Sequence, residues 1–123
     1  MLVRAARGAI TVESNDANEI IQETKVLLSA ILEENQLKID EMISVIFTMT
    51  NDLNAAFPAV AARQIGWTSI PLMCMKEIEV PGSLEKCIRV LVQFNSEKGL
   101  DEIKHVYLKG AKVLRPDLSS GKE

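Results

Sequence analysis

Arginines placed within apolar segments are the residues of this chain whose type and spacing most clearly suggest chemistry. Only five of its fourteen basic residues are arginines, and Arg89 lies inside the apolar run CIRVLV, Arg7 inside AARGAI and Arg63 inside AVAARQI. A guanidinium is always protonated and presents a planar set of N–H donors, so these arginines could bind a carboxylate or another anionic oxygen. The alternative is a structural role, either at a sheet edge or in an ion pair with Glu77 or Glu79.

Other polar side chains could complete a site around these arginines. Glu77, which lies close to Cys74 in the sequence, could orient a hydroxyl group of a ligand. Tyr107 is the only tyrosine, and it could donate a hydrogen bond from its phenol or simply pack in the core. Several arginines together suit a small ligand with more than one negative charge, but residue types alone do not name that ligand.

The common nucleophilic, metal and cofactor centres have little support in this sequence. His105 is the only histidine and no GxSxG motif accompanies it, which disfavours a Ser-His-Asp mechanism. The two cysteines, Cys74 and Cys87, have neither CxxC nor zinc-site spacing, and no P-loop or GxGxxG motif is present. We therefore expect two reduced thiols, no metal, no cofactor and no covalent nucleophile.

Length and composition predict one small globular domain. The chain has 123 residues, of which 47% are hydrophobic and 25% are charged. The net charge of −3, without any basic arm, disfavours nucleic-acid binding through a broad positive surface. No apolar run approaches the roughly 20 residues that span a bilayer, and the N-terminal residues lack the layout of a signal peptide. We expect a cytoplasmic protein that does not enter a membrane.

Hydrophobic patterning predicts five strands and two main helices in the order β-α-β-α-β-β-β. The first strand covers residues 2–12, where Gly8 indicates a bulge or the close approach of another group. The long helix starts near the possible caps Ser14, Asn15 and Asp16 and ends near Asn35. The remaining predicted elements are strands at 42–49, 69–78, 87–94 and 103–108, and a helix at 59–65 between Pro58 and Gly66.

Two helices cannot cover both faces of a five-stranded sheet. The sequence therefore predicts an α+β domain with a mixed sheet over residues 1–115, followed by a mobile tail at 116–123. One apolar face of the sheet would remain open, and we expect a partner subunit to cover it.

Seven short segments, in order along nearly the whole chain, share the pattern of one family. They are Arg4-x-x-Arg7-Gly8-Ala9-Ile10-Thr11-Val12-Glu13, Asp52-Leu53-x-x-x-Phe57-Pro58-Ala59-x-x-x-Arg63, Pro71-Leu72-x-Cys74-x-x-Glu77, Pro81-Gly82-Ser83-Leu84, Cys87-Ile88-Arg89-Val90, His105-Val106-Tyr107-Leu108 and Leu114-Arg115-Pro116-Asp117-Leu118. Together they resemble the small trimeric type of chorismate mutase. The resemblance implies a homotrimer with a pseudo-α/β-barrel appearance, active sites at the subunit interfaces, and isomerisation of chorismate to prephenate in phenylalanine and tyrosine biosynthesis.

The resemblance also implies a role for each site residue. Arg7 and Arg63 would hold the substrate carboxylates with help from Tyr107, and Arg89 would lie against the ether oxygen. Cys74 and Glu77 would meet the ring hydroxyl. The remaining substrate-binding residues implied are Phe57 and Ala59 from the adjacent subunit, Met73, Met75 and Lys76 around Cys74, and Arg115 near the mobile C-terminal segment.

The implied reaction is an intramolecular Claisen rearrangement, which needs no proton transfer and no covalent intermediate. The absence of an evident base or nucleophile agrees with this chemistry. Two alternatives remain at this stage. The chain could be a trimeric protein that binds a small carboxylate without turning it over, or a deaminase of reactive imines with a similar trimeric shape.

Overall fold

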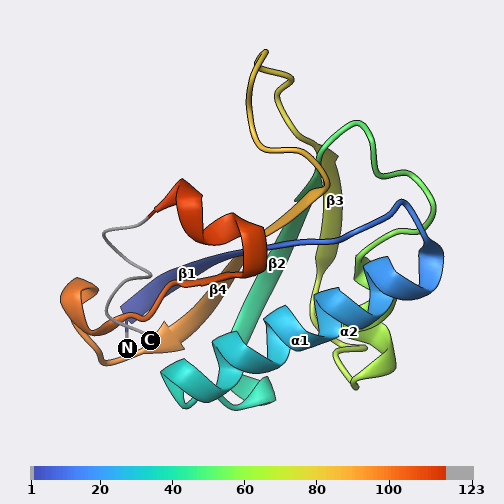
Figure 1. Ribbon diagram of the computed structural model, residues 1–123. Coiled ribbons are helices and arrows are strands. Elements are labelled where there is room, and N and C mark those ends of the chain that lie inside the picture. Colours follow the sequence, from blue (N-terminus) through green and yellow to red (C-terminus); the bar gives the residue numbers. More distant parts are fainter. Residues whose placement is uncertain (1, 116–123) are drawn as a thin grey trace.

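Five strands form one mixed sheet, and the two main helices pack against one of its faces (Figure 1). The computed structural model describes residues 2–115, so the predicted tail at 116–123 lies outside the described part. The elements in chain order are β1 (Leu2–Thr11), α1 (Ala17–Asn35), η1 (Ile39–Glu41), β2 (Met42–Met49), α2 (Ala59–Gln64), β3 (Leu72–Lys76), β4 (Cys87–Ser96), η2 (Leu100–Glu102), β5 (Val106–Leu108) and η3 (Lys109–Leu114), where η marks a 3₁₀ helix.

The strand order in the sheet is β3-β2-β4-β1-β5, and both parallel and antiparallel pairs occur. β1 and β4 pair antiparallel without interruption, from Leu2 opposite Ser96 to Thr11 opposite Cys87. β2 also runs antiparallel to β4, whereas β3 and β5 lie parallel to their neighbours at the two edges. The predicted mixed sheet of five strands is therefore confirmed.

The two faces of the sheet differ in character because successive side chains of a strand point to opposite sides. The face toward α1 and α2 carries the aliphatic and aromatic core. Its members that are fully buried in the central strands include Ala6, Ile10, Phe47, Ile88, Val92 and Phe94. The opposite face, here called the open face, carries Arg7, Thr48, Arg89 and Tyr107, and η3 covers one end of it through contacts of Ala111.

The long helix begins and ends at defined caps. Asp16 is the N-cap, and its carboxylate accepts a hydrogen bond of 2.9 Å from the N–H of Glu19. The Glu19 carboxylate in turn accepts from the N–H groups of Glu13 and Ser14, and these bonds lower the pKa of Glu19. Gln36, with a φ of 54°, ends the helix in the left-handed conformation. The predicted helix is confirmed.

Gly8 allows the helix to approach the sheet closely and does not form a bulge. A Cβ atom at this position would lie 2.7 Å from Cδ1 of Ile31 and 3.1 Å from both Cδ1 of Leu27 and the carbonyl oxygen of Val106. The pairing of β1 with β4 continues through Gly8, and the register shift in the sheet lies instead between Met42 and Ser44. Of the two predictions for Gly8, the close approach is confirmed and the bulge is wrong.

Two predicted strands are shorter than the sequence pattern indicated. The strand predicted at 69–78 spans Leu72–Lys76, and the one predicted at 103–108 spans Val106–Leu108. Just before β5, the buried side chain of Asn35 binds the backbone N–H and carbonyl of Lys104, which a neighbouring strand would otherwise bind. Its Oδ1 accepts from the N–H of Lys104 at 2.8 Å and its Nδ2 donates to the Lys104 carbonyl at 2.9 Å. The 3₁₀ helices were not predicted.

No helix within residues 2–115 is long and apolar enough to cross a membrane.

The tight contact at Gly8 predicts the cost of adding one methyl group. In Gly8→Ala, the new Cβ would overlap Ile31 and press on a backbone oxygen, so we expect the free energy of unfolding to fall by about 1–3 kcal/mol. Denaturant titration measures this change. The matched control is Gly99→Ala, where the nearest atom is the end of the exposed Asp101 side chain at 3.0 Å. Equal stabilities of the two variants would contradict the packing explanation.

Candidate active site

A cavity of about 270 Å³ on the open face brings together three of the predicted site residues. Arg7 comes from β1, Arg89 from β4 and Tyr107 from β5. Ala9 of β1 pairs with Arg89 on one side and with Tyr107 on the other. Because Ala9 is small and fully buried, the larger side chains on either side of it can face one space. Ile46, Thr48 and Leu91 also line this cavity.

Arg89 lies beside the carboxylate of Glu77. Its Nε is 3.4 Å from Oε2 of Glu77, and the exposed fractions of the two side chains are 41% and 19%. The Nε atom itself is buried and has no hydrogen-bond partner among the described residues. The same Glu77 oxygen accepts a hydrogen bond of 2.5 Å from Oγ1 of Thr48. The ion pair of Arg89 with Glu77 is the one that the residue types suggested as a structural alternative, and it includes Thr48, which sequence reasoning missed.

The backbone at Arg7 is held by the only histidine of the chain. The N–H of Arg7 donates to Nδ1 of His105 over 3.0 Å, just before β5 begins. The Arg7 side chain is exposed, which leaves its guanidinium accessible from the open face. His105 therefore has a structural contact at the strand that carries a predicted binding arginine.

A second cavity, of about 400 Å³, holds a different group of the predicted residues. Phe57, Cys74, Met75 and Lys76 line it, together with polar residues that follow β2. Cys74 pairs with Phe47 and packs against the main core, so its side chain does not share a face with Arg89. Within one chain, the structure therefore divides the predicted site between two cavities.

Apart from Glu77, four predicted residues line neither of these two cavities among the described residues. Ala59 is 5% exposed and belongs to the core, whereas Arg63 is exposed in the last turn of α2. Met73 is 56% exposed on β3. Arg115 follows η3 and is partly exposed.

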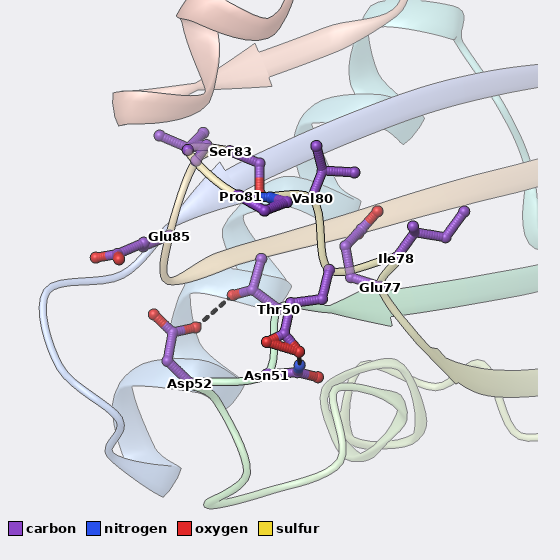
Figure 2. A pocket seen from close by; sticks show the side chains of 12 residues that line it. Thr50, Asn51, Asp52, Glu77, Ile78, Val80, Pro81, Ser83 and Glu85 are labelled. Atoms are coloured by element: carbon purple, nitrogen blue, oxygen red, sulfur yellow. Dashed lines mark hydrogen bonds between the residues drawn. The ribbon is translucent and has the colours of Figure 1, made fainter.

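A third cavity, of about 260 Å³, lies under the loop between β3 and β4 (Figure 2). Glu77 lines it and so connects it to the Arg89 cavity. At its base, Oγ1 of Thr50 donates to Asp52 over 2.5 Å and accepts from the N–H of Cys87 over 3.0 Å. The Asp52 carboxylate also accepts from the N–H of Lys86, at 3.0 Å for Oδ2.

These contacts fix the start of β4 just before Arg89. Lys86 has a φ of 49°, so its backbone adopts the left-handed region that most residues avoid, and Asp52 binds its N–H there. Sequence reasoning used Asp52 only as part of a family pattern and did not assign a role to Thr50. The available signal was weak, since short polar side chains after a strand are typical of many turns.

The two cysteines are free thiols in different surroundings. Cys87 is fully buried in the small cluster with Ala9, Tyr107 and Ala111, and Cys74 is only partly buried. Burial raises the pKa of the Cys87 thiol to about 11, although the charge of nearby Arg89 opposes that shift. No group of His, Cys, Asp and Glu side chains in the described part is arranged to hold a metal ion.

Comparisons with known proteins point to one family. The model of the family described as chorismate mutase type I matches residues 3–118. A chorismate mutase AroH from Bacillus subtilis (strain 168) is 47% identical over 120 residues, which are 97% of this chain and 94% of that protein. Another from Thermus thermophilus is 50% identical over 120 residues, 97% of this chain and 98% of that protein. A solved chorismate mutase from Clostridium thermocellum is 61% identical, with a TM-score of 0.88 over 89% of this chain and 98% of that chain.

The surroundings of the two thiols predict unequal reactivity. At pH 8, about one Cys87 thiol in 10³ is ionised if its pKa is about 11, and the group is also buried. In a Cys74→Ser variant we therefore expect Cys87 to react with an aromatic disulfide reagent only after unfolding in guanidinium. In the matched Cys87→Ser variant, Cys74 should react in the folded protein. Fast reaction of folded Cys74→Ser would refute the burial of Cys87.

Proposed function

The chain belongs to the chorismate mutase type I family and is a chorismate mutase, an isomerase, and from this premise we propose which residues carry the reaction. The substrate is chorismate, the product is prephenate, and the reaction serves aromatic amino acid biosynthesis. We propose a cytoplasmic homotrimer in which Arg89 and Glu77 face the reacting part of the substrate. The observation that carries this proposal is the single cavity lined by Arg7, Arg89 and Tyr107, with Glu77 at its side.

The chemistry sets what these residues have to supply. In the rearrangement, the ether C–O bond breaks while a C–C bond forms within the same molecule, and no proton leaves or arrives. The protein therefore has to hold a folded conformer of the substrate, which lowers the entropic part of the barrier. It also has to stabilise the negative charge that grows on the ether oxygen in the transition state.

Arg89 suits the second task. A guanidinium carries a permanent positive charge in proteins and presents planar N–H donors. It sits on a central strand next to the small Ala9, and 41% of its side chain is exposed toward the cavity. A fixed cation at this position interacts more strongly with the charged transition state than with the neutral ether of the ground state.

The remaining roles follow the charges of the substrate. Arg7 and Arg63 bind its carboxylates, and Tyr107 donates a further hydrogen bond to one of them. The carboxylate of Glu77 receives the ring hydroxyl together with the backbone of Cys74, since the Cys74 side chain packs against the core. Phe57, Met73, Met75 and Lys76 wall the pocket, as does the backbone of Ala59, since its side chain is buried. Arg115 closes the side near η3.

We propose that the two cavities combine across a subunit interface. Several large apolar side chains are exposed in the single chain, namely Ile78 at 82%, Phe57 at 68%, Met73 at 56% and Met75 at 48%. Such a concentration of exposed apolar surface indicates a covered interface. Phe57 and Arg63 of one subunit would then face Arg7, Arg89 and Tyr107 of its neighbour. This arrangement explains why one chain alone does not bring all the predicted residues together.

Removing the guanidinium of Arg89 should affect kcat most strongly. We expect Arg89→Ala to lower kcat for chorismate by on the order of 10²–10³, because the transition-state charge loses its donor. The assay follows chorismate loss by absorbance, with a chelator present. The control is Arg4→Ala, which removes the other arginine of β1, whose Nε donates to the carbonyl of Lys98 at 2.8 Å. An unchanged kcat in Arg89→Ala, at unchanged oligomer mass, would assign Arg89 a structural role.

Mixed oligomers test whether the site lies between subunits. Arg89→Ala and Arg63→Ala chains, each nearly inactive alone, would be co-expressed with different tags and purified through both. If each site takes Arg89 from one subunit and Arg63 from its neighbour, every trimer that carries both tags has one intact site out of three. We therefore expect activity well above that of either parent. Mixed trimers no more active than the parents would place both arginines in the same subunit.

A further inference from the structure

Thr48 occupies a position from which it can control the Arg89–Glu77 pair. It lies on β2, directly opposite Arg89 of β4 in the antiparallel register, and its side chain points to the open face. Its Oγ1 donates to Oε2 of Glu77 at 2.5 Å, and that same oxygen is the one 3.4 Å from Nε of Arg89. A carboxylate only accepts hydrogen bonds, so the hydroxyl is the donor.

The carboxylate of Glu77 has few other restraints. Its backbone N–H donates to the Met49 carbonyl at 3.1 Å, but β3 has already ended and the next residue, Ile78, is 82% exposed. The contact with Arg89 does not fix the carboxylate either. The Nε of Arg89 makes no hydrogen bond within residues 2–115, so the pair is held by charge, which has little directional preference.

The short hydroxyl bond is therefore the directional contact in this group of three side chains. A hydrogen bond to a charged acceptor is shorter and stronger than one between neutral groups, and it defines the position of the accepting oxygen. Once that oxygen is fixed, its attraction for Nε limits where the guanidinium can lie. A misplacement of such a group by about 1 Å can cost on the order of 10² in rate.

We infer that Thr48 is a positioning residue for the rearrangement, acting through Glu77 on Arg89 and not by touching the substrate. The inference rests on the proposed roles of Arg89 and Glu77. It assigns to one hydroxyl on a neighbouring strand the task of keeping the cation in the orientation that the transition state requires. A purely structural threonine would contribute to folding and leave turnover of the folded enzyme unaltered.

The test compares two substitutions at the same position. Thr48→Val keeps the shape and the β-branched carbon but removes the donor, and we expect kcat to fall about 10–100-fold with little change in KM. Thr48→Ser keeps the hydroxyl and should retain most of the wild-type kcat. Ser44→Ala is the location control, because Ser44 lies on the same strand and face but bonds to Gln93 over 2.6 Å. Melting temperature and oligomer mass are measured for every variant.

A double variant separates this inference from the proposed site. If Thr48 acts through Glu77, adding Thr48→Val to Glu77→Ala should lower kcat no further. Wild-type kcat in Thr48→Val, with a strong loss in Glu77→Ala, would overturn the inference and leave the role of Glu77 intact. Wild-type kcat in Glu77→Ala would overturn both. Should Thr48→Val fail to assemble, Thr48→Ala removes the same hydroxyl and has to meet the same expectation.

Discussion

The antiparallel pairing of β1 with β4 is the constraint on which the rest of this structure depends. Its uninterrupted register, from Leu2 opposite Ser96 to Thr11 opposite Cys87, places Ala9 directly beside Arg89. A slip of one residue would turn Arg89 toward the aliphatic core and a core valine toward the open face. The buried charge and the lost packing would both be costly, so the apolar face specifies the register and the register positions the arginines.

One face of the sheet carries the hydrophobic core that stabilises the fold, and the other carries the polar residues of the candidate site. α1 and α2 bury one face, where Gly8 lets Ile31 and Leu27 of the helix come close to the backbone. The open face can then carry charged groups without cost to the core. Hydrogen bonds from nearby residues hold the backbone of this face in place. His105 accepts from the N–H of Arg7, and Asp52 accepts from the N–H of Lys86 just before β4. A single layer of helices is therefore sufficient for a functional sheet, provided that another subunit covers the apolar part of the open face.

How far the sequence predicts this arrangement depends on the range of each interaction. The apolar stripe of α1 and the apolar run of β4 are local patterns, and the helix and the strand were both predicted from them. The neighbourhood of Arg7, Arg89 and Tyr107 was anticipated only through family resemblance, because three strands separated by long stretches of sequence meet there. Periodicity also does not reveal that Asn35 binds the backbone of Lys104, so that β5 begins only at Val106.

Thr48 was not predicted from the sequence because its contact with Glu77 joins two segments that are far apart in the chain. Its hydroxyl group is the property that matters for the proposed role. Enzymes that move protons usually reveal their sites by shifted pKa values. In this chain burial raises the pKa of Cys87, and hydrogen bonds shift those of Glu19 and Lys109 at the surface. None of these three is needed for a rearrangement without proton transfer. What that chemistry requires is a permanent charge in a fixed direction, and a hydroxyl on the adjacent strand provides direction without adding charge of its own. In sites of this kind, the residues that position the arginine are therefore a better signal of function than groups with shifted pKa values.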